Sequence, residues 1–123
     1  MKTISRILFA ISALVFAFGA WVHTSAFGRM SGAVTKSDLP GFFANGFRTL
    51  WLMDSCVQVA LAILFAFVAT RPAAASKPIV LLVAFIPLAT CVFIYYFIGN
   101  FIGGHLFLTG ALAAILGALL KEN

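Results

Sequence analysis

The stretch ILFAISALVFAFGAWVHTSAF, residues 7–27, is predominantly apolar and carries one histidine, His23, near its end. A helix needs about 20 apolar residues to cross the roughly 30 Å of hydrocarbon in a lipid bilayer. Three more apolar runs follow in the 123-residue chain, at about 44–69, 78–98 and 101–120. The sequence therefore predicts an all-α integral membrane protein: a four-transmembrane-helix bundle with short loops, forming a single domain over residues 1–123.

Composition supports a protein whose main partner is the lipid bilayer. Hydrophobic residues make up 63% of the chain and charged residues 9%, whereas a soluble domain carries about a quarter charged residues. The net charge of +5 comes from basic residues scattered singly at the ends of apolar runs. A nucleic-acid-binding protein gathers such residues on one face, so we expect no nucleic-acid partner.

No motif in the chain indicates catalysis. The sequence contains no glycine-rich phosphate loop, no GxSxG and no HExxH, so no catalytic residue is predicted and a non-enzymatic role is favoured. Cys56 and Cys91 lie in different apolar runs and form no CxxC pair. We expect both to be free, buried thiols, because cysteine behaves as a small hydrophobic residue.

Only the first connecting segment, GRMSGAVTKSDLPGFF at residues 28–43, is long enough to hold structure of its own. Within it, SDLP is typical of a helix start, so we expect Ser37 or Asp38 to cap the free backbone N–H groups of the second spanning helix. The other connections, TRPAAASK at 70–77 and GNFIGG at 99–104, are short.

The distribution of lysine and arginine predicts the orientation of the chain, because cytoplasmic loops carry an excess of these residues. One side of the predicted bundle carries five of them: Lys2, Arg6, Arg71, Lys77 and Lys121. The other side carries three: Arg29, Lys36 and Arg48. Both termini are therefore predicted to be cytoplasmic. The compact size, the tight loops and this simple charge bias favour the inner membrane of a bacterial cell.

An alternative interpretation is that the first run is a cleaved signal peptide. MKTISR forms a basic start, residues 7–20 an apolar core, and residues 24–26 are small enough for a signal peptidase. Cleavage would leave a three-span protein and remove His23. A helical stripe within about 60° argues against it, because a discarded peptide needs no packing face. The stripe consists of Ser12, Phe16, Gly19 and His23.

Polar residues in the other runs also gather on single helix faces. On the second run they lie within an arc of about 120°; they are Arg48, Trp51, Asp54, Ser55 and Gln58. The third run aligns Ala84, Pro87, Cys91 and Tyr95, with Tyr96 beside them. The fourth places His105 and Thr109 one turn apart, next to a small-residue seam of Gly110, Ala114 and Gly117. Such a seam lets another helix approach closely.

All four runs bring these polar residues toward the non-cytoplasmic leaflet. An ionisable group in hydrocarbon is costly, so Asp54 must face the bundle interior and find a partner. The candidates are His23, His105 and Arg48, and a histidine from a neighbouring helix is favoured because Arg48 lies on the same helix. On a straight-helix estimate Asp54 lies about 7 to 9 Å deeper than the histidines.

Three interpretations of this polar cluster remain open. Its members are His23, Arg48, Trp51, Asp54, Gln58, Tyr95, Tyr96, His105 and Thr109. They form a hydrogen-bonded network that fastens the helices of a structural or accessory subunit. Alternatively, they line a pocket for a lipophilic small molecule, with Trp51 stacking on the guest.

The third interpretation is a cofactor site. His23 and His105 would be the axial ligands of a b-type haem, or they would bind a metal ion together with Asp54. In each interpretation, four short helices enclose little internal volume. The bundle is therefore compatible with a homo-oligomer or with a place in a larger membrane complex.

Overall fold

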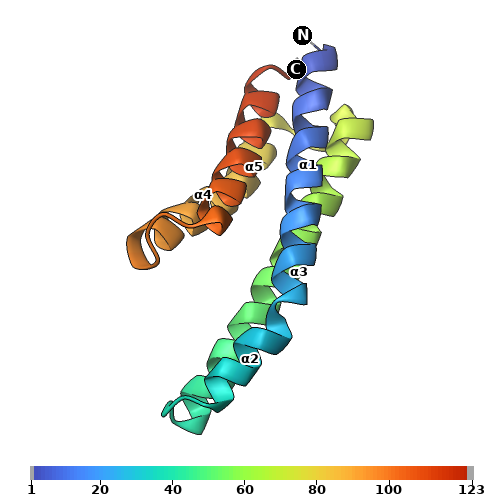
Figure 1. Ribbon diagram of the computed structural model, residues 1–123. Helices are drawn as coiled ribbons and strands as arrows, with labels where there is room; N and C mark the ends of the chain where they lie inside the picture. Colours follow the sequence, from blue (N-terminus) through green and yellow to red (C-terminus); the bar gives the residue numbers. More distant parts are fainter. Residues whose placement is uncertain (1, 122–123) are drawn as a thin grey trace.

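The computed structural model describes residues 2–121. The regular secondary structure within these residues is helical, with no strand (Figure 1). The helices are α1 (Lys2–Ser25), α2 (Phe27–Thr35), α3 (Gly41–Thr70), the 3₁₀ turn η1 (Pro72–Ala74), α4 (Lys77–Phe97) and α5 (Ile102–Leu119). Four helical units are long and apolar enough to cross a membrane, with α1 and α2 counted as one unit over Lys2–Thr35. The predicted all-helical class with four apolar helices is confirmed to that extent.

Helix α1 connects the other long helices. It packs along α3 on one side and along α5 on the other, and α4 packs along α5 (Figure 1). Within residues 2–121, α3 makes no comparable contact with α4 or α5. The order of contact is therefore α3–α1–α5–α4, and the N-terminal helix holds the two halves of the molecule together.

The first connection differs from the sequence prediction. Most of it is helical, because α2 continues the direction of α1 and α3 already begins at Gly41. The expected cap of α3 by Ser37 or Asp38 is wrong: Pro40 occupies the N-cap position and no side chain caps the helix. Ser37 instead donates its hydroxyl to the carbonyl oxygen of Val34 (2.7 Å), at the end of α2. Two or more residues before the N-cap, neither side chain is placed to reach the first turn of α3.

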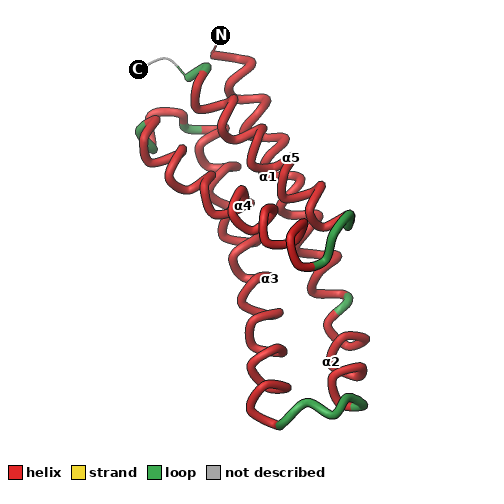
Figure 2. Tube along the Cα trace, turned by 90° about the vertical axis from the view of Figure 1, so that its left-hand side faces the viewer, coloured by secondary structure: helices red, strands yellow, loops and turns green. Residues whose placement is uncertain are grey.

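The hairpin of α2 and α3 extends beyond the other helices. Figure 2 shows α2 and the first part of α3 continuing past the turn between α4 and α5. At 1.5 Å per residue, the 30 residues of α3 span about 45 Å and the 18 residues of α5 about 27 Å. We call the protruding part, residues 27–50, the projecting hairpin.

Phenylalanines of three helices form the centre of the core. The ring of Phe65 on α3 stacks with those of Phe9 and Phe16 on α1, at centroid distances of 6.3 and 5.9 Å. Phe107 on α5 meets Phe16 edge-on at 5.9 Å. The predicted stripe of α1 is confirmed as a packing face, since its first three members are buried and His23 is half-buried. Aromatic contacts of this geometry stabilise the core beyond simple burial.

The small-residue seam of α5 is confirmed, and α1 of the same chain occupies it. A Cβ atom at Gly110 would lie 2.5 Å from Cζ of Phe16, and one at Gly117 would lie 3.0 Å from Cε1 of Phe9. This close approach lets two serines of α1 donate to glycine carbonyl oxygens of α5. Ser12 Oγ bonds Gly110 (2.9 Å) and Ser5 Oγ bonds Gly117 (2.7 Å). The seam is thus used within the chain rather than left for a second copy.

The two cysteines have different environments. Both thiols are free, as expected, but only Cys91 is buried. It lies on the α4 face that also buries Ala84 and Pro87. Cys56 is exposed, because it lies on α3 outside the face that packs on α1.

A substitution at the seam tests this packing. We expect Gly110→Ala to lower the free energy of unfolding by roughly 1 to 3 kcal/mol, the usual cost of overpacking a core. The reason is that Phe16, held between Phe65 and Phe107, has little room to move. Thermal unfolding in detergent, followed by circular dichroism, measures the effect.

Gly46→Ala is the matched control, because a Cβ there meets no atom within 4 Å and alanine favours helix. We expect its stability to be unchanged or slightly raised. Equal effects of the two substitutions would contradict close packing at Gly110.

Candidate functional site

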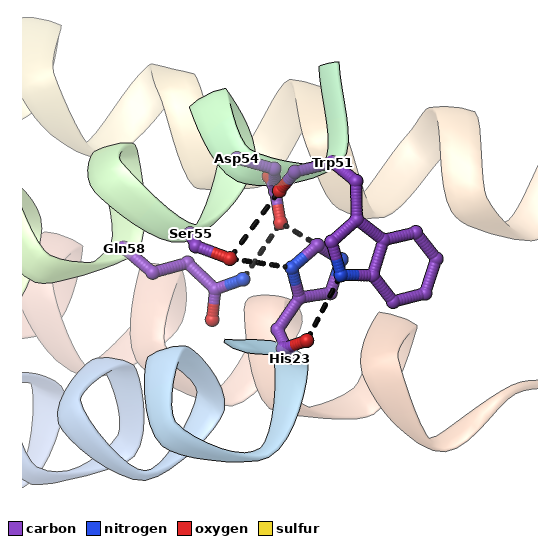
Figure 3. Close-up of polar contacts among 5 residues, drawn as sticks. All are labelled: His23, Trp51, Asp54, Ser55 and Gln58. Carbon is purple, nitrogen blue, oxygen red and sulfur yellow. Dashed lines mark hydrogen bonds and ion pairs between the residues drawn. The ribbon is translucent and has the colours of Figure 1, made fainter. Parts of the chain in front are cut away.

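A polar cluster joins the last turns of α1 to the middle of α3 (Figure 3). We call it the His23 cluster, and its members are His23, Trp51, Asp54, Ser55 and Gln58. The α3 residues recur at helical spacing and so share one face of that helix, which lies against α1. The face predicted from the sequence is therefore the contact face between α3 and α1.

Both ring nitrogens of His23 have partners on α3. Nδ1 lies 2.9 Å from the hydroxyl oxygen of Ser55, and Nε2 lies 3.5 Å from the carboxylate of Asp54. The Ser55 hydroxyl also lies 3.3 Å from the carbonyl oxygen of Trp51. It can therefore donate either to a neutral imidazole or to the backbone, and it accepts from the ring when Nδ1 carries a proton.

Trp51 covers the imidazole and bonds the α1 backbone. Its ring stacks on His23 with centroids 4.1 Å apart and planes inclined by 13°. Its indole Nε1 donates to the carbonyl oxygen of His23 at 2.9 Å. One face of the indole and its single donor are thus used within the chain. In this structure Trp51 holds α1 through these two contacts.

Asp54 finds the kind of partner that the sequence predicts, a histidine from a neighbouring helix. The same carboxylate oxygen that faces His23 accepts a 2.7 Å hydrogen bond from Nε2 of Gln58. Gln58 is buried, and its side-chain amide occupies the space above Gly19, where a Cβ atom would collide with it. Gly19 thus lets the amide of Gln58 lie against α1.

The predicted depth difference between Asp54 and the histidines is wrong for His23, because the two side chains are neighbours. The estimate counted from an assumed helix start at residue 44. In the structure α3 begins at Gly41, and its first turns pair with α2 beyond the end of α1. That pairing shifts the middle of α3 to the level of His23.

Arg48 belongs to the projecting hairpin and not to Asp54. Its guanidinium donates to the hydroxyl and carbonyl oxygens of Ser31 (2.8 and 3.3 Å) and to the hydroxyl of Thr35 (2.7 Å), all on α2. It also bonds Asn45 on its own helix at 3.1 Å. Arg48 therefore fastens α2 to α3, and it is not a partner of Asp54 in this structure.

The remaining candidates form a second, separate group at the turn between α4 and α5. The hydroxyl of Tyr95 lies 2.7 Å from Nδ1 of His105, and Nε2 of His105 lies 2.8 Å from Oδ1 of Asn100. Thr109 donates to the carbonyl oxygen of His105 at 2.8 Å. Tyr96 is 80% exposed and meets only Phe97 among the ring contacts of the described chain.

The structure does not assemble the metal site considered from the sequence. Within residues 2–121, no three His, Cys, Asp or Glu side chains are grouped as metal ligands, so His23, His105 and Asp54 do not form a triad. His23 and His105 belong to different helix pairs, and each has both ring nitrogens engaged. Axial ligation of a shared haem would require breaking contacts in both groups.

A shallow apolar groove of about 470 Å³ lies on the outer surface between α1 and α3, and none of the candidate residues lines it. Its lining residues are Ala17, Ala20, Trp21, Thr24, Val59, Ala62 and Ile63.

Two contact residues escaped the sequence-based selection. Ser55 lies on the polar arc of α3, but a serine in a helix usually bonds its own backbone, so it carries little signal. Asn100 lies in the turn five residues before His105. The sequence signal for Asn100 is a polar side chain in a turn that lies close in sequence to a histidine.

Substitutions at Asp54 test the His23 cluster. We expect Asp54→Leu to lower the free energy of unfolding by about 1 to 3 kcal/mol, because it leaves the buried amide of Gln58 without its acceptor. Asp54→Asn keeps an acceptor oxygen and should cost less than Asp54→Leu. Unfolding in detergent measures both variants.

Asp38→Leu provides the control, since Asp38 is exposed and lies in the connection between α2 and α3. It should leave stability within about 0.5 kcal/mol of the wild type. A wild-type stability for Asp54→Leu would show that the cluster does not hold α1 to α3.

Comparisons with models of known protein families, with curated proteins and with solved structures find no match for this chain. The function is therefore inferred from the geometry of the His23 cluster, from the arrangement of the helices and from the distribution of charge.

Proposed function

We propose that the chain is a non-enzymatic, multi-pass protein of the cell inner membrane that serves as a structural or accessory subunit. In this proposal the His23 cluster fastens α1 to α3. The supporting observation is that the polar groups are satisfied within the chain. In residues 2–121, no buried side-chain nitrogen or oxygen lacks a hydrogen-bond partner. A site that waits for a polar ligand group usually keeps such an atom free.

Fastening α1 matters because, within residues 2–121, it is the helix that links α3 to the pair α4–α5 through extensive contacts. In lipid, apolar side chains gain little by leaving the hydrocarbon, so close packing and interhelical hydrogen bonds supply the association energy. The α1–α3 pair has such bonds at both ends. The His23 cluster lies at one end, and Arg6 donates to the carbonyl oxygen of Ala69 (2.8 Å) at the other.

The projecting hairpin supports placement at a membrane surface. Helix α5 matches the hydrocarbon thickness, whereas α3 exceeds it by roughly ten residues. The excess carries exposed aromatic side chains, namely Phe42, Phe43 and Phe47. Arg29 and Lys36 on the same hairpin are also exposed. Aromatic and basic residues are favoured at the boundary between headgroups and water.

The orientation proposal places both termini in the cytoplasm. The start of α1 and the end of α5 lie at the same end of the molecule (Figure 1), where Ser5 bonds Gly117. Five basic residues lie at this end, against three at the other, which is the bias expected of a cytoplasmic face.

The position of α1 also supports its retention in the mature protein. Its buried face contacts both α3 and α5, and it contributes Phe9 and Phe16 to the core. Loss of residues 1–26 would expose the seam of α5 and remove one partner of Asp54. We therefore propose four spans, and not the three that cleavage would leave.

A second candidate function is binding of a lipophilic small molecule in the α1–α3 groove. The observation that favours it is the apolar lining of the groove together with the exposed ring of Trp21. Such a molecule would lie on the outside of the helix pair and would not replace the contacts of the His23 cluster.

Reporter fusions test the topology. We expect a fluorescent protein fused to the C-terminus to fold and fluoresce in bacterial cells. Alkaline phosphatase inserted between Lys36 and Leu39 should be active, because it is active only outside the cytoplasm. The opposite pattern of the two reporters would contradict the orientation.

Native mass spectrometry of the protein purified in mild detergent tests retention of α1 and the second candidate function. We expect the mass of the full-length chain with no discrete adduct other than phospholipid. A retained adduct that Ala62→Trp removes and Leu82→Trp keeps would establish the groove as a binding site. Ala62 lines the groove, whereas Leu82 is exposed on α4. A chain shorter by about 26 residues would show that the first run is cleaved.

A further inference from the structure

A basic cavity lies at the end of the molecule that holds both termini. Its volume is about 680 Å³. Its walls come from the start of α1, the connection between α3 and α4, the start of α4 and Lys121, two residues beyond the end of α5. Four basic side chains line it, Lys2, Arg6, Lys77 and Lys121, and none of the described lining residues is acidic. The His23 cluster lies toward the other end of α1, so this cavity is a separate feature.

Hydrogen bonds hold three of these cations in place without neutralising them. Arg6 Nε bonds the carbonyl oxygen of Ala69 (2.8 Å), and Lys77 Nζ bonds that of Leu119 (3.2 Å). Lys121 Nζ bonds the carbonyl oxygen of Ala75. These acceptors are neutral, and each bond uses only one of the several N–H donors of its cation. The three cations are thus positioned around the cavity and keep their positive charge.

The start of α4 adds a second source of positive potential. Ser76, Lys77 and Pro78 line the cavity, and no side chain caps this 21-residue helix. Apart from Pro78, which has no N–H, the residues of the first turn have backbone N–H groups without intrahelical acceptors, and the helix dipole places partial positive charge there. Fixed cations and an uncapped helix start around one cavity are the features that bind phosphate groups.

We propose that this cavity binds the phosphate group of an anionic phospholipid. The proposal rests on the membrane placement given above. The charge of the cavity complements a phosphodiester that bears an uncharged headgroup, and exposed apolar side chains continue from the cavity along α4 toward the hydrocarbon. Ile79 is 53% exposed and Leu82 is 72% exposed. Basic pockets between spanning helices on the cytoplasmic side bind lipid headgroups by the same chemistry.

The test uses the full-length protein in detergent and native mass spectrometry with two added lipids of identical acyl chains, phosphatidylglycerol and phosphatidylcholine. We expect the wild type to retain phosphatidylglycerol at least fivefold better than phosphatidylcholine. Raising the salt concentration should reduce this preference, because the interaction is between charges. Equal retention of the two lipids would overturn the proposal without the use of any variant.

A pair of charge-removing variants locates the site. Lys77→Gln with Lys121→Gln should weaken binding of phosphatidylglycerol by about fivefold for each cation removed. Arg29→Gln with Lys36→Gln removes the same charge at the other end of the molecule and should keep the preference. Equal losses in the two double variants would reduce the effect to net charge and overturn the proposal.

Lys77→Arg with Lys121→Arg keeps the charge and controls for folding. It should retain the preference for phosphatidylglycerol, and helicity by circular dichroism should match the wild type in every variant compared. Loss of the preference in this arginine variant, with helicity intact, would contradict recognition by charge.

Inorganic phosphate separates the two sources of the same chemistry. At millimolar concentration it should leave bound phosphatidylglycerol in place, since the acyl chains add contact with α4. Displacement at that concentration would identify free phosphate as the ligand and overturn the lipid assignment.

Flotation with phosphatidylcholine vesicles separates failure of the lipid proposal from failure of the proposed membrane placement. A protein that inserts into these vesicles but shows no preference for phosphatidylglycerol in mass spectrometry refutes this proposal alone. A protein that does not insert refutes the membrane placement too.

Discussion

Packing of α1 between α3 and α5 is the constraint on which the other features of the structure depend. Two contact types make it close: glycines of α5 that admit the rings of Phe9 and Phe16, and serine hydroxyls of α1 that bond the carbonyl oxygens of the same glycines. Both depend on short backbone distances, so each supports the other. In a lipid environment such contacts supply what the hydrophobic effect supplies in water. Through α1, α3 and the α4–α5 pair are packed into one bundle.

The polar residues divide according to this arrangement. Those of α3 that face α1 form the His23 cluster, in which Trp51 stacks on the imidazole and Asp54 accepts from Gln58. Those at the α4–α5 turn form an independent group around His105. Each group satisfies its own members across one helix pair. Both groups therefore hold helices together, and the proposed structural or accessory role rests on this arrangement.

The two ends of the molecule differ in what they offer to a membrane. The projecting hairpin presents exposed phenylalanines and single basic residues, which are suited to an interface. The end with both termini presents a cavity lined by fixed cations. The proposed orientation uses this asymmetry: the hairpin end would rest in the outer headgroup region, and the other end would hold an anionic headgroup of the cytoplasmic leaflet.

The pattern of apolar residues was enough to predict the four long helices, their apolar character and the face of α1 that is buried. Those properties follow from local periodicity: the stripe of Ser12, Phe16 and Gly19 repeats at the helical period, and so does the polar arc of α3. The sequence also indicated that Asp54 pairs with a histidine, because a buried carboxylate needs a partner.

The identity of that histidine, His23, and its position along α3 follow from the tertiary structure. The offset between α1 and α3 depends on the helical connection between them, and a few residues of extra helix move every contact along the pair. The structure alone also shows that His105 and His23 lie in different groups, that Arg48 bonds α2 and not Asp54, and that cations distant in sequence line one cavity. These are long-range relations between helices, which local periodicity does not encode.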